Sequence, residues 1–376
     1  MRRPQTQRAA VLVLGGYGAF GALAAERLAR TPGIEVIVAG RSAAKAEAFA
    51  ARLGGGAADA TCLSGLGVDA QDATAVAAAL AALQPTVLIN ATGPYQAQDY
   101  RVARAAIAAG VHYIDLADAR AFVTGIVALD GEARRADVLV VSGASSVPAV
   151  SGAVLAAHAG RLPSVTAVET VIAPANSFDP GIGTTRSILG TLGKRLGPAF
   201  ADSGYGWQGL ARRRLAGLGG RWASLCDAPD LELLPARHPG LADVRVYAAL
   251  EVAAVHLGLW GLSWLVRAGL MHTPERLAAP LLGLKRRLHA FGSDRGGMAV
   301  TLSGTDANGR PQRLTWSLVA GTGHGPYIAA TPSVLLAKRV LAGSVTPRGA
   351  MPCLGLLTLD DILTDLADLD VIAGVG

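Results

Sequence analysis

The chain has 376 residues, which is enough for two domains with separate cores. Its formal charge is +6, but the basic residues are dispersed and are not interleaved with aromatic residues in a known motif, so nucleic acid is excluded as a partner. The three cysteines are scattered, which excludes a disulfide framework, and the scattered histidines predict no metal site. These features favour a cytoplasmic protein.

The first 25 residues imitate an export signal, because a basic start at 1–8 precedes an apolar run. Glycines at positions 15, 16, 18 and 21 argue against an inserted helix, since each interior glycine costs about 1 kcal/mol relative to alanine. A strand at 9–14, a Gly-x-Gly-x-x-Gly turn, a helix at 19–30 and a strand at 34–39 fit better. This order predicts one βαβ unit.

A turn of this kind suits a pyrophosphate. One glycine permits the reversal, a second lets the phosphates approach the backbone, and a third lets the helix pack on the strand. The helix start adds roughly half a positive charge. The alternative is a glycine-rich turn that binds nothing. The cofactor residues predicted here are Gly16, Tyr17, Gly18, Ala19, Phe20 and Gly21.

The residues at the end of the second strand indicate which of the two nicotinamide cofactors a domain of this kind prefers. An acid there binds the ribose 2′-hydroxyl of NAD, whereas a base accommodates the 2′-phosphate of NADP. This chain has no acid at that end, and Arg41, Ser42 and Lys45 follow the strand. Because a guanidinium pairs bidentately with phosphate, we predict NADP(H), with these three residues at the phosphate. The alternative is that Arg41 and Lys45 only open a solvated helix.

Strands and helices alternate up to residue 150, which predicts an α/β fold with a Rossmann-type, doubly wound parallel sheet. Further helices are expected at 43–53, 73–83, 100–109 and 121–136, and further strands at 86–90, 112–116 and 138–143, with a short strand ending near 69. Ligands of such a sheet lie beyond the carboxyl ends of its strands. We therefore expect Asp69 near the adenine and Asn90, Thr92, Gly93 and Pro94 near the nicotinamide ribose.

Hydride transfer also needs a titratable group near the nicotinamide. The candidates are Tyr95, Asp118 and, from the second half of the chain, His324. Arg186, with Thr185, is a candidate clamp for an acidic substrate. The alternatives are that Asp118 caps the next helix, that His324 is structural and that Arg186 lies on the surface.

The second half predicts an α+β domain with an open, mostly antiparallel sheet, built from strands at 165–174 and 244–252 and a hairpin at 297–321. Substrate binding is expected in this domain, and a homodimer is left open. We expect domains at 7–150 and 151–330, with 331–376 packing back on the first. Residues 203–240, rich in Gly, Arg and Pro, predict an irregular insertion.

The segment 252–266 is strongly apolar. As a helix it reaches only about 22 Å, short of the roughly 30 Å hydrocarbon core, so it does not span a membrane. An ordinary buried helix, an apolar substrate pocket, a partner interface and peripheral contact with a membrane surface all remain open for it.

Five segments, GGYGAFG, AGR, INATGPY, AGVHYIDLAD and SGASSVPAVSGAVL, occur in this order within the first 155 residues. Together they resemble the saccharopine dehydrogenase (saccharopine reductase-like) NADP-binding family. The resemblance implies a nicotinamide-binding domain, an α+β domain and reduction of imines formed between an amine and an oxo acid, although other relatives are enoyl reductases. Many members place Gly-Glu after the HYIDL strand, where this chain has Ala117-Asp118-Ala119, so the role of that acid passes to a shorter side chain or is lost.

We therefore expect an NADP-dependent oxidoreductase that transfers hydride between NADPH and a small imine, carbonyl or activated alkene. No Lys and His pair with an acid–base arrangement is evident, which argues against saccharopine itself. The alternative is a non-catalytic NADP-binding protein, acting as a sensor or a membrane-associated scaffold. Convergent polar groups beside the Gly93-Pro94-Tyr95 turn would favour the enzyme, and a closed or apolar cleft would favour the scaffold.

Overall fold

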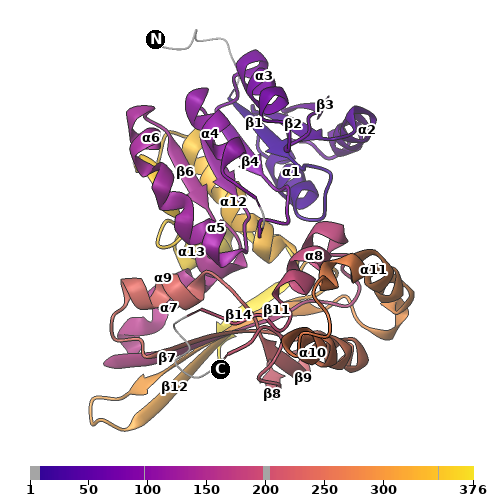
Figure 1. The fold of residues 1–376 in the computed structure, drawn as a ribbon. Helices are drawn as coiled ribbons and strands as arrows, with labels where there is room; N and C mark the ends of the chain where they lie inside the picture. Colours follow the sequence, from indigo (N-terminus) through magenta and orange to yellow (C-terminus); the bar gives the residue numbers. More distant parts are fainter. Residues whose placement is uncertain (1–8, 97, 198–203, 346) are drawn as a thin grey trace.

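The structure is a computed structural model that describes residues 9–96, 98–197, 204–345 and 347–376. Two seven-stranded sheets organise the two halves of the molecule, one above the other in Figure 1. The basic start at 1–8 and Ser203, the first residue of the expected insertion, lie outside the described residues.

The first sheet is parallel throughout, in the order β13-β6-β5-β4-β1-β2-β3. Side chains alternate along β1, so that Val11 and Val13 enter one core while Leu12 and Leu14 enter the core on the opposite face. Such burial on both faces is typical of a doubly wound sheet, which confirms the predicted fold class. Its strands are β1 (Ala10–Leu14), β2 (Glu35–Gly40), β3 (Cys62–Gly67), β4 (Val87–Asn90), β5 (His112–Asp115), β6 (Leu139–Ser142) and β13 (Gly349–Pro352).

Helices connect these strands close to the predicted positions: α1 (Gly21–Ala29), α2 (Ala43–Gly54), α3 (Ala73–Leu83) and α4 (Arg101–Ala108). The single helix expected at 121–136 is instead divided into α5 (Arg120–Gly125), a 3₁₀ turn (Ile126–Leu129) and α6 (Asp130–Arg135). Gly125, a weak helix former, ends α5, and the 3₁₀ turn buries Ile126 and Leu129 completely.

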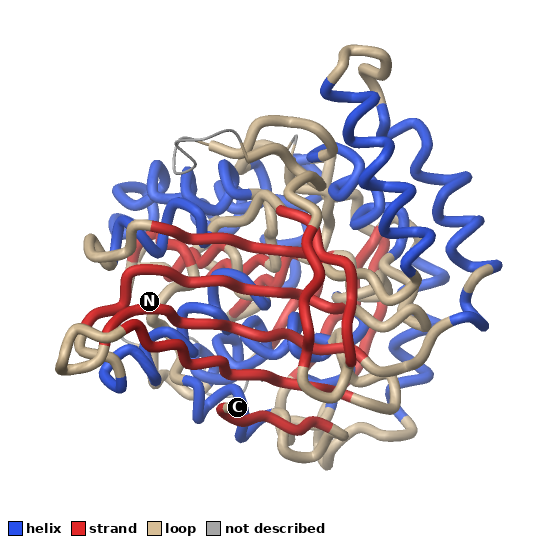
Figure 2. Tube along the Cα trace, turned by 90° about the horizontal axis from the view of Figure 1, so that it is seen from below, coloured by secondary structure: helices blue, strands red, loops and turns tan. Residues whose placement is uncertain are grey.

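The second sheet has the order β14-β12-β11-β7-β10-β9-β8 and is open and mostly antiparallel, as predicted, with β7 and β10 as a parallel pair. Figure 2 shows its strands from the face turned away from the first domain. The strands are β7 (Ser164–Ala173), β8 (Ala211–Leu215), β9 (Gly219–Leu225), β10 (Asp243–Ala248), β11 (Gly296–Thr305), β12 (Pro311–Ala320) and β14 (Val371–Val375).

The expectation of an irregular insertion at 203–240 is wrong for its described part, which forms β8, β9 and α9 (Asp230–Arg237). One of its arginines contacts β7. The Arg213 guanidinium donates from Nε and Nη2 to the two carboxylate oxygens of Glu169 on β7, each at 2.8 Å. This ion pair connects the β8–β9 hairpin to β7.

Along the chain, the first domain is followed by α7 (Ser151–His158), and β7 is followed by α8 (Gly181–Thr191). Beside the second sheet, α8 lies together with α10 (Ala253–Arg267) and α11 (Ala278–Arg287) (Figure 1). The α10 helix contains most of the apolar segment predicted not to span a membrane. Among the described residues, no helix combines the length and apolarity that crossing a bilayer requires.

The C-terminal segment belongs to both halves of the molecule. Helix α12 (Tyr327–Leu341) packs against α1 and the first sheet, and β13 extends that sheet beside β6. Helix α13 (Leu359–Asp365) follows, and β14 then pairs with β12 in the second sheet.

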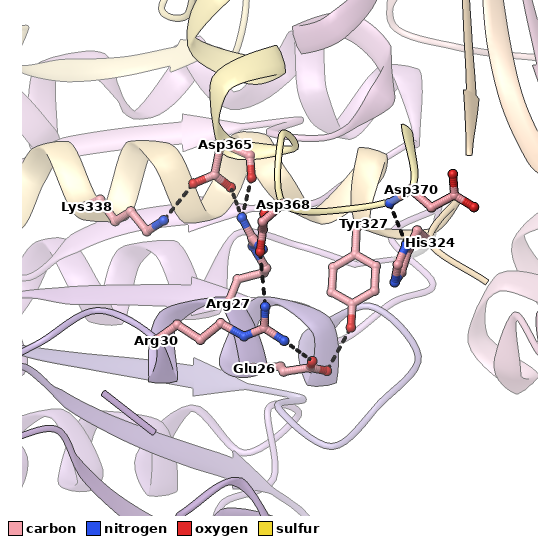
Figure 3. Close-up of polar contacts among 9 residues, drawn as sticks. All are labelled: Glu26, Arg27, Arg30, His324, Tyr327, Lys338, Asp365, Asp368 and Asp370. Atoms are coloured by element: carbon pink, nitrogen blue, oxygen red, sulfur yellow. Dashed lines mark hydrogen bonds and ion pairs between the residues drawn. The ribbon is translucent and has the colours of Figure 1, made fainter. Parts of the chain in front are cut away.

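A network of charges holds this segment to α1 (Figure 3). Arg27, only 6% exposed, contacts Asp368 at 2.6 Å and Asp365 at 3.3 Å. Lys338 contacts the second oxygen of Asp365 at 2.6 Å. The hydroxyl of Tyr327 donates to Glu26 at 2.8 Å. The helix that follows the glycine turn is therefore anchored by residues from the far end of the chain.

Candidate cofactor and substrate site

The glycine turn between β1 and α1 requires glycine on geometric grounds. Gly15 has a φ of +82°, and a Cβ at Gly21 would lie 2.2 Å from the Gly15 carbonyl oxygen. The first turn of α1 has no acidic residue, and no side chain caps it. The N–H groups of Gly16 and Gly18 donate to the carbonyls of Ala39 and Gly15, at 3.0 and 2.9 Å, so an anionic ligand would bind at the uncapped helix start that follows them. The turn has the form that a pyrophosphate needs.

The loop after β2 lies against this turn through Tyr17. A Cβ at Gly40 would lie 2.5–2.8 Å from atoms of the Tyr17 side chain, and the Tyr17 hydroxyl accepts the backbone N–H of Ser42 at 2.9 Å. The Ser42 hydroxyl accepts the N–H of Lys45 and so caps α2, while Arg41 and Lys45 are exposed. Ser42 thus helps to form the loop that presents two free cationic side chains beside the turn.

The residues after β3 and β4 mainly shape their own loops. Asp69 is exposed and its carboxylate accepts the N–H of Gln71 at 3.0 Å. Asn90 is buried, and its amide oxygen accepts the N–H and the hydroxyl of Thr92 at 3.1 and 2.6 Å. These bonds hold the chain in position for Gly93 and Pro94, which line the cavity described next.

A cavity of about 920 Å³ lies between the two domains. One end is bounded by the glycine turn, through Gly18, Ala19 and Phe20, and by the loop after β4. The Phe20 ring packs on Phe178 of the second domain, with the ring centroids 5.4 Å apart. The other walls come from β7, β10, α8, α10 and α11. The site predicted at the edge of the first sheet is thus closed by the second domain.

Three polar side chains converge in this cavity: Gln96, Asp118 and Ser187. The Ser187 hydroxyl donates to Asp118 at 3.0 Å, and the Gln96 amide donates to the other carboxylate oxygen at 3.4 Å and also to Ser187. The Asp118 side chain is accessible to solvent through the open cavity, but it lies deep among protein atoms. Desolvation by these atoms raises its pKa, although the hydrogen bonds from Ser187 and Gln96 oppose the rise by stabilising the carboxylate.

The other charged groups that line the cavity have partners within the protein. Asp227 is paired with Arg120 at 2.7 Å. Glu251 accepts the N–H and the hydroxyl of Ser293 at 2.9 and 2.6 Å. The Lys285 ammonium donates to the carbonyls of residues 176 and 178. Asp118 differs from the two other acids in its partners. Asp227 pairs with Arg120 and Glu251 lies 3.9 Å from Arg221, whereas Asp118 is hydrogen-bonded to the neutral side chains of Ser187 and Gln96.

The other proposed catalytic residues are placed less favourably. Tyr95 lines the cavity, but its hydroxyl donates to the Asn90 carbonyl at 2.7 Å, and burial raises its pKa well above the usual value. His324 does not line the cavity, and its Nδ1 accepts the N–H of Asp370 at 2.9 Å. Of the three candidates, Asp118 therefore presents its titratable group to the cavity, whereas the Tyr95 hydroxyl and His324 do not.

The proposed substrate clamp does not assemble either. Arg186 is exposed and does not line the cavity. Thr185 does line it, but its hydroxyl donates to the Gly181 carbonyl at 2.8 Å within α8. The helix containing both residues turns the guanidinium outward and leaves Ser187 facing Asp118.

Sequence reasoning missed Gln96 and Ser187. Gln96 directly follows the predicted Gly93-Pro94-Tyr95 turn, and Ser187 directly follows Arg186, so each lies one position from a residue that was proposed. The helical pattern of buried positions would not have distinguished Ser187 from an ordinary core residue, because Ser187 is buried like Leu189. Only the pairing with Asp118 identifies it.

Among the described residues, no three His, Cys, Asp or Glu side chains gather in a way that could hold a metal ion.

Comparisons with known proteins agree with this geometry. Residues 11–143 match the family described as the saccharopine dehydrogenase NADP binding domain. No curated protein matches the chain. The fold is similar to that of a saccharopine dehydrogenase (L-Glu forming) from Saccharomyces cerevisiae, with a TM-score of 0.64, 14% identity, and coverage of 98% of this chain and 100% of that chain. An amine dehydrogenase from Mycobacterium smegmatis aligns with a TM-score of 0.49 and 13% identity over 93% of this chain and 96% of that chain.

Proposed function

Residues 11–143 belong to the saccharopine dehydrogenase NADP binding domain family, and on that premise we propose that this oxidoreductase uses NADPH to reduce a polarised C=O, C=N or C=C bond. The cofactor is NADP(H). The donor set fits it, because the uncapped start of α1 offers amides to a pyrophosphate and the loop after β2 offers exposed cations to a third phosphate.

The residues that would hold the cofactor come from three loops. The turn from Gly16 to Gly21 would bind the pyrophosphate. Arg41, with Lys45 and Ser42, would bind the 2′-phosphate. Asp69 and the segment Asn90 to Pro94 would border the adenine and the nicotinamide ribose. When bound, the cofactor supplies a hydride, which leaves the protein to orient the substrate and to deliver one proton.

Asp118 is the group that we assign to the proton. Its raised pKa favours the protonated acid, which can transfer its proton to the oxygen, nitrogen or carbon that becomes electron-rich as the double bond is reduced. Ser187 and Gln96 hold the carboxyl group in place and stabilise the carboxylate that remains. The observation that carries this proposal is the convergence of these three side chains in the cavity that also contains the glycine turn.

The same observation favours an enzyme over a non-catalytic NADP-binding scaffold. A scaffold has no need for a titratable carboxyl with a raised pKa that two neutral side chains hold beside the cofactor turn. Within the described chain, Asp118 and its two partners meet from different elements of both domains.

The test is a screen for NADPH oxidation with pooled aldehydes, ketones, enoyl compounds and amine and oxo-acid pairs. We expect turnover with at least one pool, and a loss of about 10²–10⁴-fold in kcat for Asp118→Asn. NADPH binding should be retained in that variant, which a fluorescence titration measures. Turnover that is unchanged in Asp118→Asn would remove this residue from the mechanism, and NADPH binding without turnover in any pool would support the scaffold.

A further inference from the structure

We propose that the substrate is a neutral molecule in which the reducible double bond is attached to a long apolar chain, so that the chain lies between α10 and α11 while the double bond lies beside Asp118. This inference rests on the proposed function, because it identifies the substrate class of the same cavity. It departs from amino acids and oxo acids, which carry at least one charged carboxylate.

The lining of the cavity changes character along its length. Beyond the polar cluster of Gln96, Asp118 and Ser187, the walls supplied by α10, by α11 and by the 3₁₀ turn before α11 are aliphatic and include Leu259, Leu262, Leu277 and Leu281. These side chains are only partly buried, although they pack on the core formed by Leu189, Leu192 and Trp207. These walls of the cavity are therefore an apolar surface that the described protein covers only in part.

The charges around the cavity argue against an anionic substrate. Lys285 is the basic side chain that lines it within the described chain, and its ammonium is bonded to two backbone carbonyls, which use two of its three N–H groups. Burial lowers its pKa, which makes its charge costlier rather than more available. Asp227 and Glu251 add negative charge to the walls, and Asp118 is a third acidic group there. A carboxylate substrate would be desolvated here against more acidic than basic groups.

The apolar lining reaches the surface of the molecule. Ile182 on α8 and Leu284 on α11 both line the cavity and are 37% and 50% exposed. Exposed side chains of this size at the rim of an apolar cavity are typical of an opening for an apolar ligand. A long chain that projects from the reacting carbon can therefore extend along α10 toward this opening without burying a polar group.

Two glycines of α10 provide a matched pair of variants. Gly258 lines the cavity and Gly261 does not, and a Cβ at either position would meet no atom within 4 Å. Gly258→Phe should fill part of the apolar channel, whereas Gly261→Phe should not. Each replaces a helical glycine on the same helix, so any shared effect on folding appears in both.

The experiment measures binding and turnover separately. Displacement of the neutral dye Nile red gives the affinity for butanal, octanal and dodecanal and for the corresponding 2-oxo acids, and NADPH oxidation gives turnover. We expect the affinity for the aldehydes to rise by about threefold to fourfold for each added methylene, the oxo acids to bind more weakly, and Gly258→Phe, but not Gly261→Phe, to abolish the dependence on chain length.

The outcomes separate the two proposals. Affinity that does not depend on chain length, preference for the oxo acids, or equal behaviour of the two glycine variants would overturn the apolar substrate. Chain-length-dependent binding with no NADPH oxidation by any compound would leave the apolar ligand in place and contradict the proposed function instead.

Discussion

The hydroxyl of Tyr17 accepts the backbone N–H of Ser42 at 2.9 Å, which joins the glycine turn to the loop that carries Arg41. The two loops would contact different phosphates of one cofactor. Their relative position is therefore set by the protein before the cofactor binds. This reduces the conformational entropy that the two loops lose on binding.

The preference for NADPH should depend on Arg41. We expect Arg41→Ala to weaken NADPH binding by about 10–100-fold, because a charge-assisted hydrogen bond contributes roughly 1.5–3 kcal/mol, and to leave NADH binding almost unchanged. Titration of both cofactors by fluorescence measures this. Arg52→Ala, at the other end of α2, is the control and should not change either affinity. Equal affinities of the wild type for the two cofactors would contradict the proposed role of Arg41.

The contact between Tyr17 and Gly40 should be sensitive to one methyl group. Gly40→Ala places a carbon 2.5–2.8 Å from the Tyr17 side chain, so the side chain must move, at a cost of about 1–3 kcal/mol, and NADPH binding should weaken. In a Tyr17→Ala background the same methyl should cost much less. Thermal unfolding and NADPH titration of the double-mutant cycle give this coupling. Gly56→Ala, where a Cβ meets no atom within 4 Å, is the control, and additive effects would show that the two residues do not interact.

The pH dependence of reduction should follow Asp118. Reduction uses the protonated acid, so kcat should fall as the pH rises through the raised pKa of this group. Ser187→Ala removes a hydrogen bond that stabilises the carboxylate, so it should raise the pKa further and move the falling limb to higher pH. Asp118→Glu should restore part of the activity that Asp118→Asn loses. A falling limb that stays in place in Ser187→Ala would exclude Asp118 as its source.

The Arg27 network should contribute strongly to stability. Arg27→Met leaves Asp365, 8% exposed, with Lys338 as its remaining ion-pair partner, and we expect a loss of about 3 kcal/mol in chemical denaturation. Asp368→Asn should cost under about 1 kcal/mol because that side chain is 49% exposed. The hydrogen bond from Arg27 lowers the pKa of Asp368, so its contribution is present above the ordinary pKa and is lost as the pH falls through the lowered one.

The control for this network is Arg134→Ala, which removes an exposed ion pair within α6 and should change stability by no more than about 0.5 kcal/mol. A similar loss in Arg27→Met and Arg134→Ala would contradict the importance of burial.

Asp230 should oppose stability at neutral and higher pH. Its carboxyl group is fully buried, and burial raises its pKa to about 7, although the hydroxyl of Ser151 opposes the rise. The unfolded chain loses this proton near its ordinary pKa, so the free energy of unfolding should fall as the pH rises from about 4 to about 7. Asp230→Asn should remove this decline. Denaturation at several pH values measures it, and parallel curves for the two proteins would refute it.

The first domain was predictable because its signals are local. Apolar runs at β1 and β2 and the glycines between them define the turn, and the alternation of strands and helices defines the parallel sheet. The edge strands β13 and β14 were not predictable from the sequence, because each is short and pairs with a strand that is distant in the sequence.

The site was predictable only in part. Asp118 was a candidate because it follows a strand, but its partner Ser187 lies 69 residues away, and no periodicity links the two. The direction of a hydroxyl is likewise set by tertiary packing, as Tyr95 illustrates by donating to the Asn90 carbonyl rather than into the cavity.

The distribution of the last strands affects how the chain can fold as it leaves the ribosome. Because β13 completes one sheet and β14 the other, neither sheet has all its strands until residues 349–375 have been synthesised. The two domains therefore cannot be finished one after the other during translation. Their outer strands β6 and β12 remain unpaired on one side until the end, as exposed edges open to chaperones and to self-association.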